Sequence, residues 1–442
     1  MPSKSVSAGL SACTAFVAGS ALVSVAGPLN PPGGAVASTY KTLSEVEPRI
    51  AINAANTPGD ADSLFRITQP GSYYLTGNIT GVVGKHGIEI AASGVTLDLS
   101  GFDLVGVPGM GAFDGVSTSV GGLTNVAVVN GSVRNWGNDG VDLGTLSATN
   151  CRLESVVASG NTSRGIRTSS GATITNCSAY DNSGSGISTG SGCTVVNCSS
   201  YSNTFNGIST GSGCTVVNCS SYSNTIDGIS PAFGCTVSNC TAYDNTGNGI
   251  ITASDCTVLD CSASSNAING ISLVGDNCTV VNCTASANAG HGISAFNGCT
   301  ITNCTANNNL ARGINTNNGC QVTGCLTRNN QSDGIVVNFA CTVSGSTCNG
   351  DGTAAGDQGG IRVLGQANRV ESNNVTFADR GLLVDAGGNV IVRNTVSSCT
   401  VNWVVAANNK CLVVLGINGA AINGNSGGTA PGSTDPNANF SY

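Results

Sequence analysis

A repeat of 21 residues occupies the middle of this chain and constrains its fold more than any other feature. Its clearest mark is a Gly-Ile step, and all but one of the intervals between these steps are 21 residues; the interval from Gly270 to Gly292 is 22. The steps begin at Gly165, Gly186, Gly207, Gly228, Gly249, Gly270, Gly292, Gly313 and Gly334. A fixed period of this kind indicates an array of one structural unit.

Aligned copies show which positions face the interior. The column that contains Val195 is β-branched in every copy from Val195 to Val343, and the Gly-Ile isoleucines form a second such column. Inward and outward positions are expected to alternate from Cys193 to Val196, with Cys193 and Val195 inward, which is strand periodicity. Asn197 follows, and its column holds only Asn, Asp and Gly, the residue types that tolerate left-handed turns.

Each repeat therefore reads as three short strands joined by tight turns, with no helical periodicity. Stacking such units gives a parallel β-helix with three parallel sheets and a rise of about 4.8 Å per coil. A second Asn column is unbroken and is predicted to form an amide ladder between coils. Its members are Asn182, Asn203, Asn224, Asn245, Asn266, Asn288, Asn309 and Asn330.

The pattern G-I-x-(small)…T-[VI]-x-N-x-x-[AS]-x-x-N resembles the repeat of right-handed parallel β-helix proteins, the pectate-lyase-like superfold. The resemblance covers about residues 65–415 and implies the right-handed sense. It leaves the activity open, because this superfold carries lyases, hydrolases, epimerases, adhesins and inert scaffolds. The opening GPLNPPGG…TYKTLSEVEPR…ITQPGSYYLTGNIT resembles that of an uncharacterised family of secreted bacterial β-helix proteins.

The rest of the chain divides around the repeat. Residues 1–26 are typical of a secretory signal, and Cys13 lies within a weak lipoprotein box. Residues 27–39 form a Pro/Gly linker, and 40–64 are predicted to cap the open sheet edges of the first coil. The β-helix is expected over 65–415, with regular repeats at about 151–349, and 416–442 form a tail rich in Gly, Asn and Pro. After the signal, no apolar stretch is long enough to span a bilayer.

Charge excludes some partners. Only 9% of residues are charged, the net charge is −8, and basic residues do not cluster, so nucleic acid is not expected as a ligand. A polysaccharide or a cell-surface protein is the expected partner, and the expected location is secreted, periplasmic or at the cell surface.

Twenty cysteines remain beyond the signal, and sixteen of them fall in two interior columns. Three interpretations stay open for them: packing as small apolar side chains, disulfides between coils or across the Asn turn, and metal binding. The columns are Cys193, Cys214, Cys235, Cys256, Cys278, Cys299, Cys320 and Cys341, and Cys177, Cys198, Cys219, Cys240, Cys261, Cys283, Cys304 and Cys325.

The outer face of the Gly-Ile strands carries the active site in pectate-lyase-like enzymes, so that column is where the resemblance places catalysis. Asp142 and Arg167 stand on adjacent coils and are the candidate catalytic pair. Five residues in the preceding turns are predicted to line the same patch: Arg164, Asp139, Asp114, Lys85 and His86. An ordinary surface ion pair is the competing interpretation. No metal ligands are assigned, and calcium is expected only if the chain is a lyase.

Two other surfaces are candidate ligand-binding faces. Thr194, Thr215 and Thr236 belong to a flat, uncharged Thr/Val array that suits glycan contact or side-by-side self-association. An outward aromatic stripe consists of Tyr180, Tyr201, Tyr222 and Tyr243, and it suits stacking on sugar rings or packing between strands. Together these features favour an exported, non-catalytic scaffold. The alternative is a polysaccharide lyase or related glycan-active enzyme that uses the Gly-Ile face.

Overall fold

A computed structural model describes residues 47–352, 356–415 and 435–442. The chain divides into two compact units, Met1–Pro48 and Arg49–Tyr442, and the second, which holds every described strand, is treated by itself. The predicted signal and linker, residues 40–46 of the predicted cap, and residues 416–434 of the tail lie outside the described residues. The described residues form strands and turns but no helix, and so contain no helix that could span a membrane.

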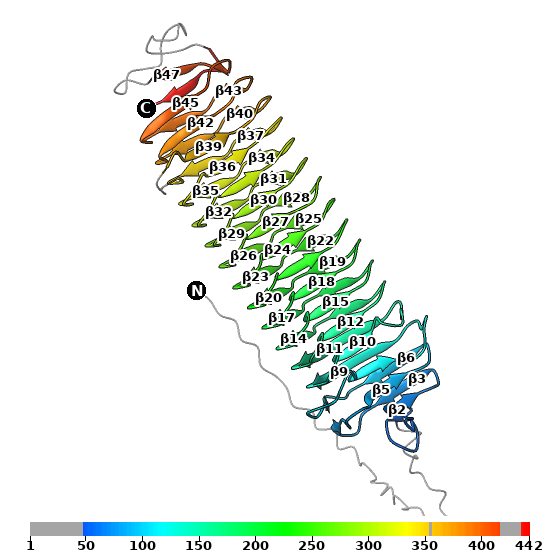
Figure 1. Ribbon diagram of the computed structural model, residues 1–442. Coiled ribbons are helices and arrows are strands. Elements are labelled where there is room, and N and C mark those ends of the chain that lie inside the picture. Colours follow the sequence, from blue (N-terminus) through cyan, green and yellow to red (C-terminus); the bar gives the residue numbers. More distant parts are fainter. Residues whose placement is uncertain (1–46, 353–355, 416–434) are drawn as a thin grey trace, which may run out of the picture. The chain divides into compact units, whose positions relative to one another are not determined.

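The strands fall into three stacks along the coil axis (Figure 1). The Gly-Ile strands form one 16-stranded sheet. It consists of β2 (Ser63–Ile67), β5 (His86–Ile90), β8 (Val116–Thr118), β10 (Val141–Leu143), β12 (Ile166–Thr168), β15 (Ile187–Thr189), β18 (Ile208–Thr210), β21 (Ile229–Pro231), β24 (Ile250–Thr252), β27 (Ile271–Leu273), β30 (Ile293–Ala295), β33 (Ile314–Thr316), β36 (Ile335–Val337), β39 (Gly359–Val363), β42 (Arg380–Val384) and β45 (Val401–Val405).

The Cys-Thr-Val strands form the second stack. It consists of β1 (Ile50–Ala51), β3 (Gly71–Tyr74), β6 (Val95–Asp98), the first halves of β9 (Ala127–Arg134) and β11 (Arg152–Ser159), β13 (Thr173–Thr175), β16 (Thr194–Val196), β19 (Thr215–Val217), β22 (Thr236–Ser238), β25 (Thr257–Leu259), β28 (Thr279–Val281), β31 (Thr300–Thr302), β34 (Gln321–Thr323), β37 (Thr342–Ser344), β40 (Arg369–Glu371), β43 (Val390–Val392) and β46 (Lys410–Cys411). Its sheet already includes β1, on the N-terminal side of the predicted start of the coils.

The Cys-Ser-Ser/Ala strands form the third stack. It consists of β4 (Ile79–Thr80), β7 (Asp103–Val105), the second halves of β9 and β11, β14 (Ser178–Tyr180), β17 (Ser199–Tyr201), β20 (Ser220–Tyr222), β23 (Thr241–Tyr243), β26 (Ser262–Ser264), β29 (Thr284–Ser286), β32 (Thr305–Asn307), β35 (Leu326–Arg328), β38 (Thr347–Asn349), β41 (Asn374–Thr376), β44 (Thr395–Ser397), β48 (Asn439–Ser441) and β47 (Val413–Leu415).

All named strand pairs are parallel and in register, so equivalent residues of successive repeats lie directly over one another, as Thr194 lies over Thr215. The prediction of an all-β parallel β-helix is confirmed. The second and third stacks belong to one 32-stranded sheet, because β9 and β11 continue without a break through the Asn turn that separates the stacks elsewhere.

Left-handed residues five positions apart make the corners of each coil. In one repeat they are Gly192, Asn197 and Ser202, with φ angles of 66°, 54° and 54°. The Asn197 column is thus a column of left-handed turns, as its composition predicts. Because these corners recur at the same positions, each strand from β12 to β38 keeps to three residues and each coil covers the one before it.

The interior is a set of stacked identical side chains. The Ile column, the Val195 column and both cysteine columns are almost completely excluded from solvent. The cysteines of the described residues are all free thiols, which agrees with the packing interpretation and not with disulfides. Their sulfurs also pair with the backbone: the Cys193 amide donates to Cys214 Sγ at 3.2 Å, and Cys193 Sγ donates to the Ser169 carbonyl at 3.1 Å.

The predicted Asn ladder is present and fully hydrogen-bonded. Asn203 Nδ2 donates to Asn224 Oδ1 at 3.0 Å and to the Ala179 carbonyl at 3.1 Å, and the Asn203 amide donates to the same Oδ1 at 3.1 Å. The pattern repeats at every step from Asn161 to Asn330. Every buried side-chain amide therefore depends on the next coil for its partners.

The ladder ends on a carboxylate. Asp351 Oδ1 accepts from Asn330 Nδ2 at 2.7 Å, and Asp351 Oδ2 accepts from the Thr327 hydroxyl at 2.6 Å. An acceptor-only group suits this end, because an ionised carboxylate has no hydrogen to pass onward. Burial raises the pKa of Asp351 to about 6, against the effect of these hydrogen bonds.

The end of the chain contributes a strand to the last coils. β48 lies between β44 and β47, pairing with both. Asn439 in this strand accepts from Asn394 Nδ2 at 2.9 Å and so extends a second, shorter Asn ladder that begins at Asn373. Phe440 pairs in register with Thr395, so this part of the tail is docked on the sheet.

The buried carboxyl of Asp351 predicts a pH-dependent stability. Its pKa lies higher in the folded chain than in the unfolded chain, so its ionisation destabilises the fold as pH rises from about 4 to above 6. Asp351→Asn retains an acceptor for Asn330 and removes this cost. We expect the variant to match the parent near pH 4 and to be of order 3 kcal/mol more stable at pH 8 in thermal unfolding. Parallel stability–pH profiles for parent and variant would contradict this.

Candidate functional site

Three carboxylates gather at the N-terminal end of the Gly-Ile sheet. Asp114 immediately precedes Gly115 and β8, Asp139 precedes Gly140 and β10, and Asp142 lies within β10. One oxygen from each lies within 4.8 Å of the others, and all three residues are buried. We call these three residues the acid cluster.

Two members of the acid cluster belong to a second ladder. The residue directly before the first glycine of each Gly-Ile (or Gly-Val) step forms this ladder. Its side chain accepts a hydrogen bond from the backbone amide of the equivalent residue in the next coil. Asp114 Oδ1 accepts from the Asp139 amide at 2.9 Å, and Asp139 Oδ1 accepts from the Arg164 amide at 2.7 Å. Farther along, Asn206, Asp227, Asn248 and Asn269 accept in the same way. A single acceptor atom per side chain satisfies this ladder.

The electrostatics of the acid cluster follow from its burial. The pKa of Asp114 is raised to about 7, mainly by burial. The carboxylates of Asp142 and Asp139 contribute to the rise, whereas hydrogen bonds from the Asp139 amide and Asn138 oppose it. His86 Nδ1 accepts from the Asp114 amide at 2.9 Å and lies 3.5 Å from Asp114 Oδ2. Burial lowers the pKa of His86, so its neutral form is favoured.

Asp142 and Arg167, the predicted catalytic pair, are brought together. They are register partners in β10 and β12, and Arg167 Nη1 lies 3.8 Å from Asp142 Oδ2. Asp142 is also occupied locally: Oδ1 accepts from the amides of Gly144 and Thr145 at 2.8 and 2.9 Å, and Oδ2 accepts from the Thr145 hydroxyl. Asp142 therefore stabilises the turn after β10 through these hydrogen bonds, and it also faces Arg167.

Of the other residues predicted to line this patch, four reach it and one points elsewhere. Asp114 and Asp139 complete the acid cluster, His86 contacts Asp114, and Arg164 Nη1 lies 3.8 Å from Asp139 Oδ2. Lys85 Nζ instead donates to the backbone carbonyls of Asp60 and Ser63. A second acidic group, Asp60, Asp62 and Glu89, lies in that neighbourhood.

The predicted tyrosine stripe consists of rings stacked on each other. Successive centroids of Tyr180, Tyr201, Tyr222 and Tyr243 are 4.7–4.9 Å apart with interplanar angles of 4–6°. The ring faces between these tyrosines are therefore covered by their neighbours, and edges and hydroxyls remain for a ligand. Thr194, Thr215 and Thr236 form an in-register, half-buried row, as the flat array requires.

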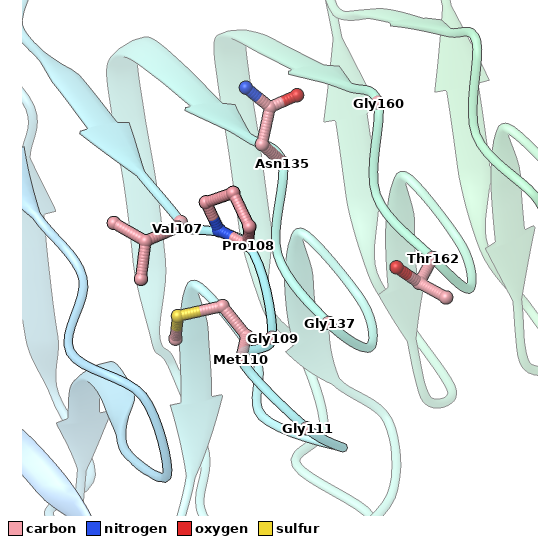
Figure 2. Close-up of a pocket in the computed structure, with 10 residues that line it drawn as sticks. Val107, Pro108, Gly109, Met110, Gly111, Asn135, Gly137, Gly160 and Thr162 are labelled. Carbon is pink, nitrogen blue, oxygen red and sulfur yellow. The ribbon is translucent and has the colours of Figure 1, made fainter.

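A groove of about 440 Å³ lies along the turns that precede the Gly-Ile sheet near the acid cluster (Figure 2). Val107, Pro108, Met110, Asn135 and Thr162 supply its side chains, and glycines form much of the rest. Packing accounts for several of these glycines: a Cβ on Gly137 would lie 1.8 Å from the Gly111 carbonyl oxygen.

A second groove, of about 430 Å³, follows the other edge of the same sheet, and we call it the amide groove. It crosses the coils of β27, β30, β33, β36 and β39. Its lining is uncharged: Ser272, Leu273, Val274, Ser294, Ala295, Phe296, Asn315, Thr316, Asn317, Asn338 and Leu364. The repeat does not reveal this groove, because its turn column has no common residue type: it holds Val274, Phe296, Asn317, Asn338 and Leu364.

The comparisons with known proteins identify the class. A family model described as "Right handed beta helix region" matches residues 114–257 and 233–325. Together with the in-register parallel coils, this makes the chain a right-handed β-helix repeat protein, as the sequence resemblance implies. No curated protein matches the sequence.

Similar solved structures include an epimerase module, a pectate lyase and a bacteriophage tailspike protein. The A-module of mannuronan C-5 epimerase AlgE4 from Azotobacter vinelandii is 14% identical, with 73% of this chain and 91% of that chain covered and a TM-score of 0.43. Pectate lyase Pel9A is 19% identical, with 70% and 80% covered and a TM-score of 0.32. A tailspike protein of E. coli bacteriophage HK620, in complex with pentasaccharide, is 14% identical, with 77% and 79% covered and a TM-score of 0.41.

The contacts of Asp142 predict that its acceptor oxygens matter more to stability than its charge does. In metal-free buffer, Asp142→Ala leaves the amides of Gly144 and Thr145 without their acceptor and should cost about 1–3 kcal/mol in chemical unfolding. Asp142→Asn retains one acceptor oxygen and should cost less. Arg167→Ala serves as the control. Its partly exposed contacts, an ion pair with Asp142 at 3.8 Å and a hydrogen bond to Thr145 Oγ1 at 2.6 Å, contribute about 1 kcal/mol or less. Equal losses for the Ala and Asn variants would show that charge is the important property.

Proposed function

We propose that this protein is an exported, non-catalytic scaffold that binds a neutral polysaccharide in the amide groove. The observation that carries the proposal is the lining of this groove, which combines amide and hydroxyl groups with exposed apolar side chains and contains no charged residue. Sugar hydroxyls need groups that both donate and accept, and the side-chain amides of Asn317 and Asn338 do both. Asn315 Oδ1 already accepts from Arg312 Nη1 at 2.7 Å, so the Asn315 amide contributes mainly its N–H groups.

The exposed apolar side chains of the groove suit the C–H face of a sugar ring. Phe296 and Val274 are 45% and 57% exposed, and both lie in the same turn column as Asn317 and Asn338. A solvent-exposed phenyl ring beside amides offers an apolar surface for the C–H face of a sugar, while the amides hold its hydroxyls. Asn338 Nδ2 donates to Asn317 Oδ1 at 3.2 Å, so these two amides already hold one another in place.

The length of the groove favours a chain over a single sugar. Its lining comes from five successive coils, which at about 4.8 Å per coil corresponds to a run of roughly 19 Å. Because the groove has no basic residue and the chain carries a net charge of −8, a neutral polymer is favoured over an acidic one.

The acid cluster gives less support to the alternative, a polysaccharide lyase or related enzyme acting through Asp142 and Arg167. General acid–base catalysis needs a side chain within hydrogen-bonding reach of the substrate. The three carboxylates are buried, and backbone amides occupy one oxygen of each. The feature that favours the alternative is Asp114, because a carboxyl with a pKa of about 7 can serve as an acid at neutral pH.

Binding to a panel of neutral and acidic polysaccharides tests the proposal. We expect retention on a neutral polymer without new chain ends. Phe296→Ala combined with Asn317→Ala should weaken retention at least about tenfold, because central aromatic contacts contribute most to such sites. Phe205→Ala is the matched control, since Phe205 is similarly exposed on another turn.

Three results would contradict the proposal. One is loss of binding in Tyr222→Ala but not in the groove variant, which would move the site to the tyrosine stripe. Another is release of chain ends that Asp142→Ala abolishes, which would make the chain an enzyme. Failure to bind any polymer while a protein is retained would replace the polysaccharide with a protein partner.

A further inference from the structure

The acid cluster holds more negative charge than the fold uses. Its ladder needs one acceptor per side chain, and Asn206, Asn248 and Asn269 meet that need without charge at the equivalent positions. Asp114 and Asp139 instead occupy adjacent coils, with Asp142 beside them. Like charges so close and so buried are unfavourable unless a cation or a proton balances them.

One oxygen of the cluster has no hydrogen bond. Asp139 is 1% exposed, and its Oδ2 has no hydrogen-bond partner, although Oδ1 accepts from the Arg164 amide. Arg164 Nη1 lies 3.8 Å from this Oδ2, beyond hydrogen-bond distance, and Arg167 Nη1 is equally distant from Asp142 Oδ2. A buried carboxylate oxygen without a partner is costly, so this atom requires an explanation.

Together these features point to a cation. We propose that Asp114, Asp139 and Asp142 bind a divalent cation of the calcium type, with water completing the coordination. Calcium takes oxygen ligands at about 2.4 Å, so two of its ligand oxygens lie at most about 4.8 Å apart, and the three carboxylate oxygens of this cluster all fall within that limit. Carboxylates are the ligands that such an ion prefers, and its charge would balance the surplus of the acid cluster.

The second acidic group is a poorer candidate for the same ion. Asp60 already accepts from the Ser63 hydroxyl at 2.7 Å and from Arg66 Nη1 at 2.6 Å. Asp62 is exposed, and Arg66 also lies 3.9 Å from Glu89. Here arginine and hydroxyl donors already bond to the carboxylates, so groups of the chain itself balance their negative charge.

Trp136 provides a spectroscopic probe of the acid cluster. It is fully buried, and its indole lies against the two coils that carry His86 and Asp114: Cβ atoms on Gly87 and Gly115 would lie 2.9 Å from it. Gly115 directly follows Asp114 in the chain. A terbium ion in the calcium position would therefore sit close enough to this indole to be excited through it.

Terbium luminescence of the full chain, excited through tryptophan, tests the site. We expect emission that saturates with added Tb³⁺ and is displaced by Ca²⁺. Asp139→Asn should weaken Tb³⁺ binding at least about tenfold while retaining Oδ1 for the Arg164 amide. Asp333→Asn is the matched control: Asp333 is a buried carboxylate in the same column, 3.3 Å from Arg312 Nε, and this variant should bind normally. Ca²⁺ should also raise the Tm of the parent but not of Asp139→Asn.

Three outcomes would overturn the proposal. The first is that no sensitised emission is seen and equilibrium dialysis detects no bound Ca²⁺. The second is that the parent and a folded Asp139→Asn variant bind Tb³⁺ equally. The third is that only Asp60→Asn loses binding, which would place the ion in the other acidic group. The amide groove shares no residue with the acid cluster, so failure here leaves the proposed polysaccharide binding untouched.

Discussion

The fold depends on hydrogen bonds that each coil makes to the next. In the Asn ladder, every buried side-chain amide donates to its equivalent one coil farther on, and every amide oxygen accepts from the coil before. A buried amide without partners is costly, so a single coil cannot keep these residues in an apolar interior. The ladder therefore fixes the register of the repeat, and strand pairing and the stacked Ile, Val and Cys columns depend on that register.

The same register determines where function can lie. Interior columns must repeat, because a different residue would break a ladder or leave a void between coils. Outward and turn positions are less restricted, and the acid cluster and most of the amide groove are built from them. The column before Gly-Ile shows the difference clearly: Asn248 and Asp139 fill the same ladder role, but only Asp139 brings a charge that the ladder does not use.

Sequence alone predicted the coil because the repeat encodes it directly. The left-handed turn at Asn197, the Asn ladder and the approach of Asp142 to Arg167 all follow from aligning copies at a fixed period. Other features do not follow from the period. The amide groove is formed by unlike residues in one turn column, and the mutual stacking of Tyr201 and Tyr222 depends on side-chain rotamers that the period does not specify. The docking of β48 joins segments far apart in sequence, which no local pattern encodes.

The most direct test of this account removes one step of the ladder. Asn224→Ala leaves the Asn203 backbone amide without its acceptor, removes one acceptor from Asn203 Nδ2 and removes one of the two donors to Asn245 Oδ1. We predict a loss of at least about 3 kcal/mol in the free energy of unfolding, measured by chemical denaturation. Thr225→Ala, at the exposed neighbouring position, is the control and should change little. A loss for Asn224→Ala within about 1 kcal/mol of the control would contradict the central role of the ladder.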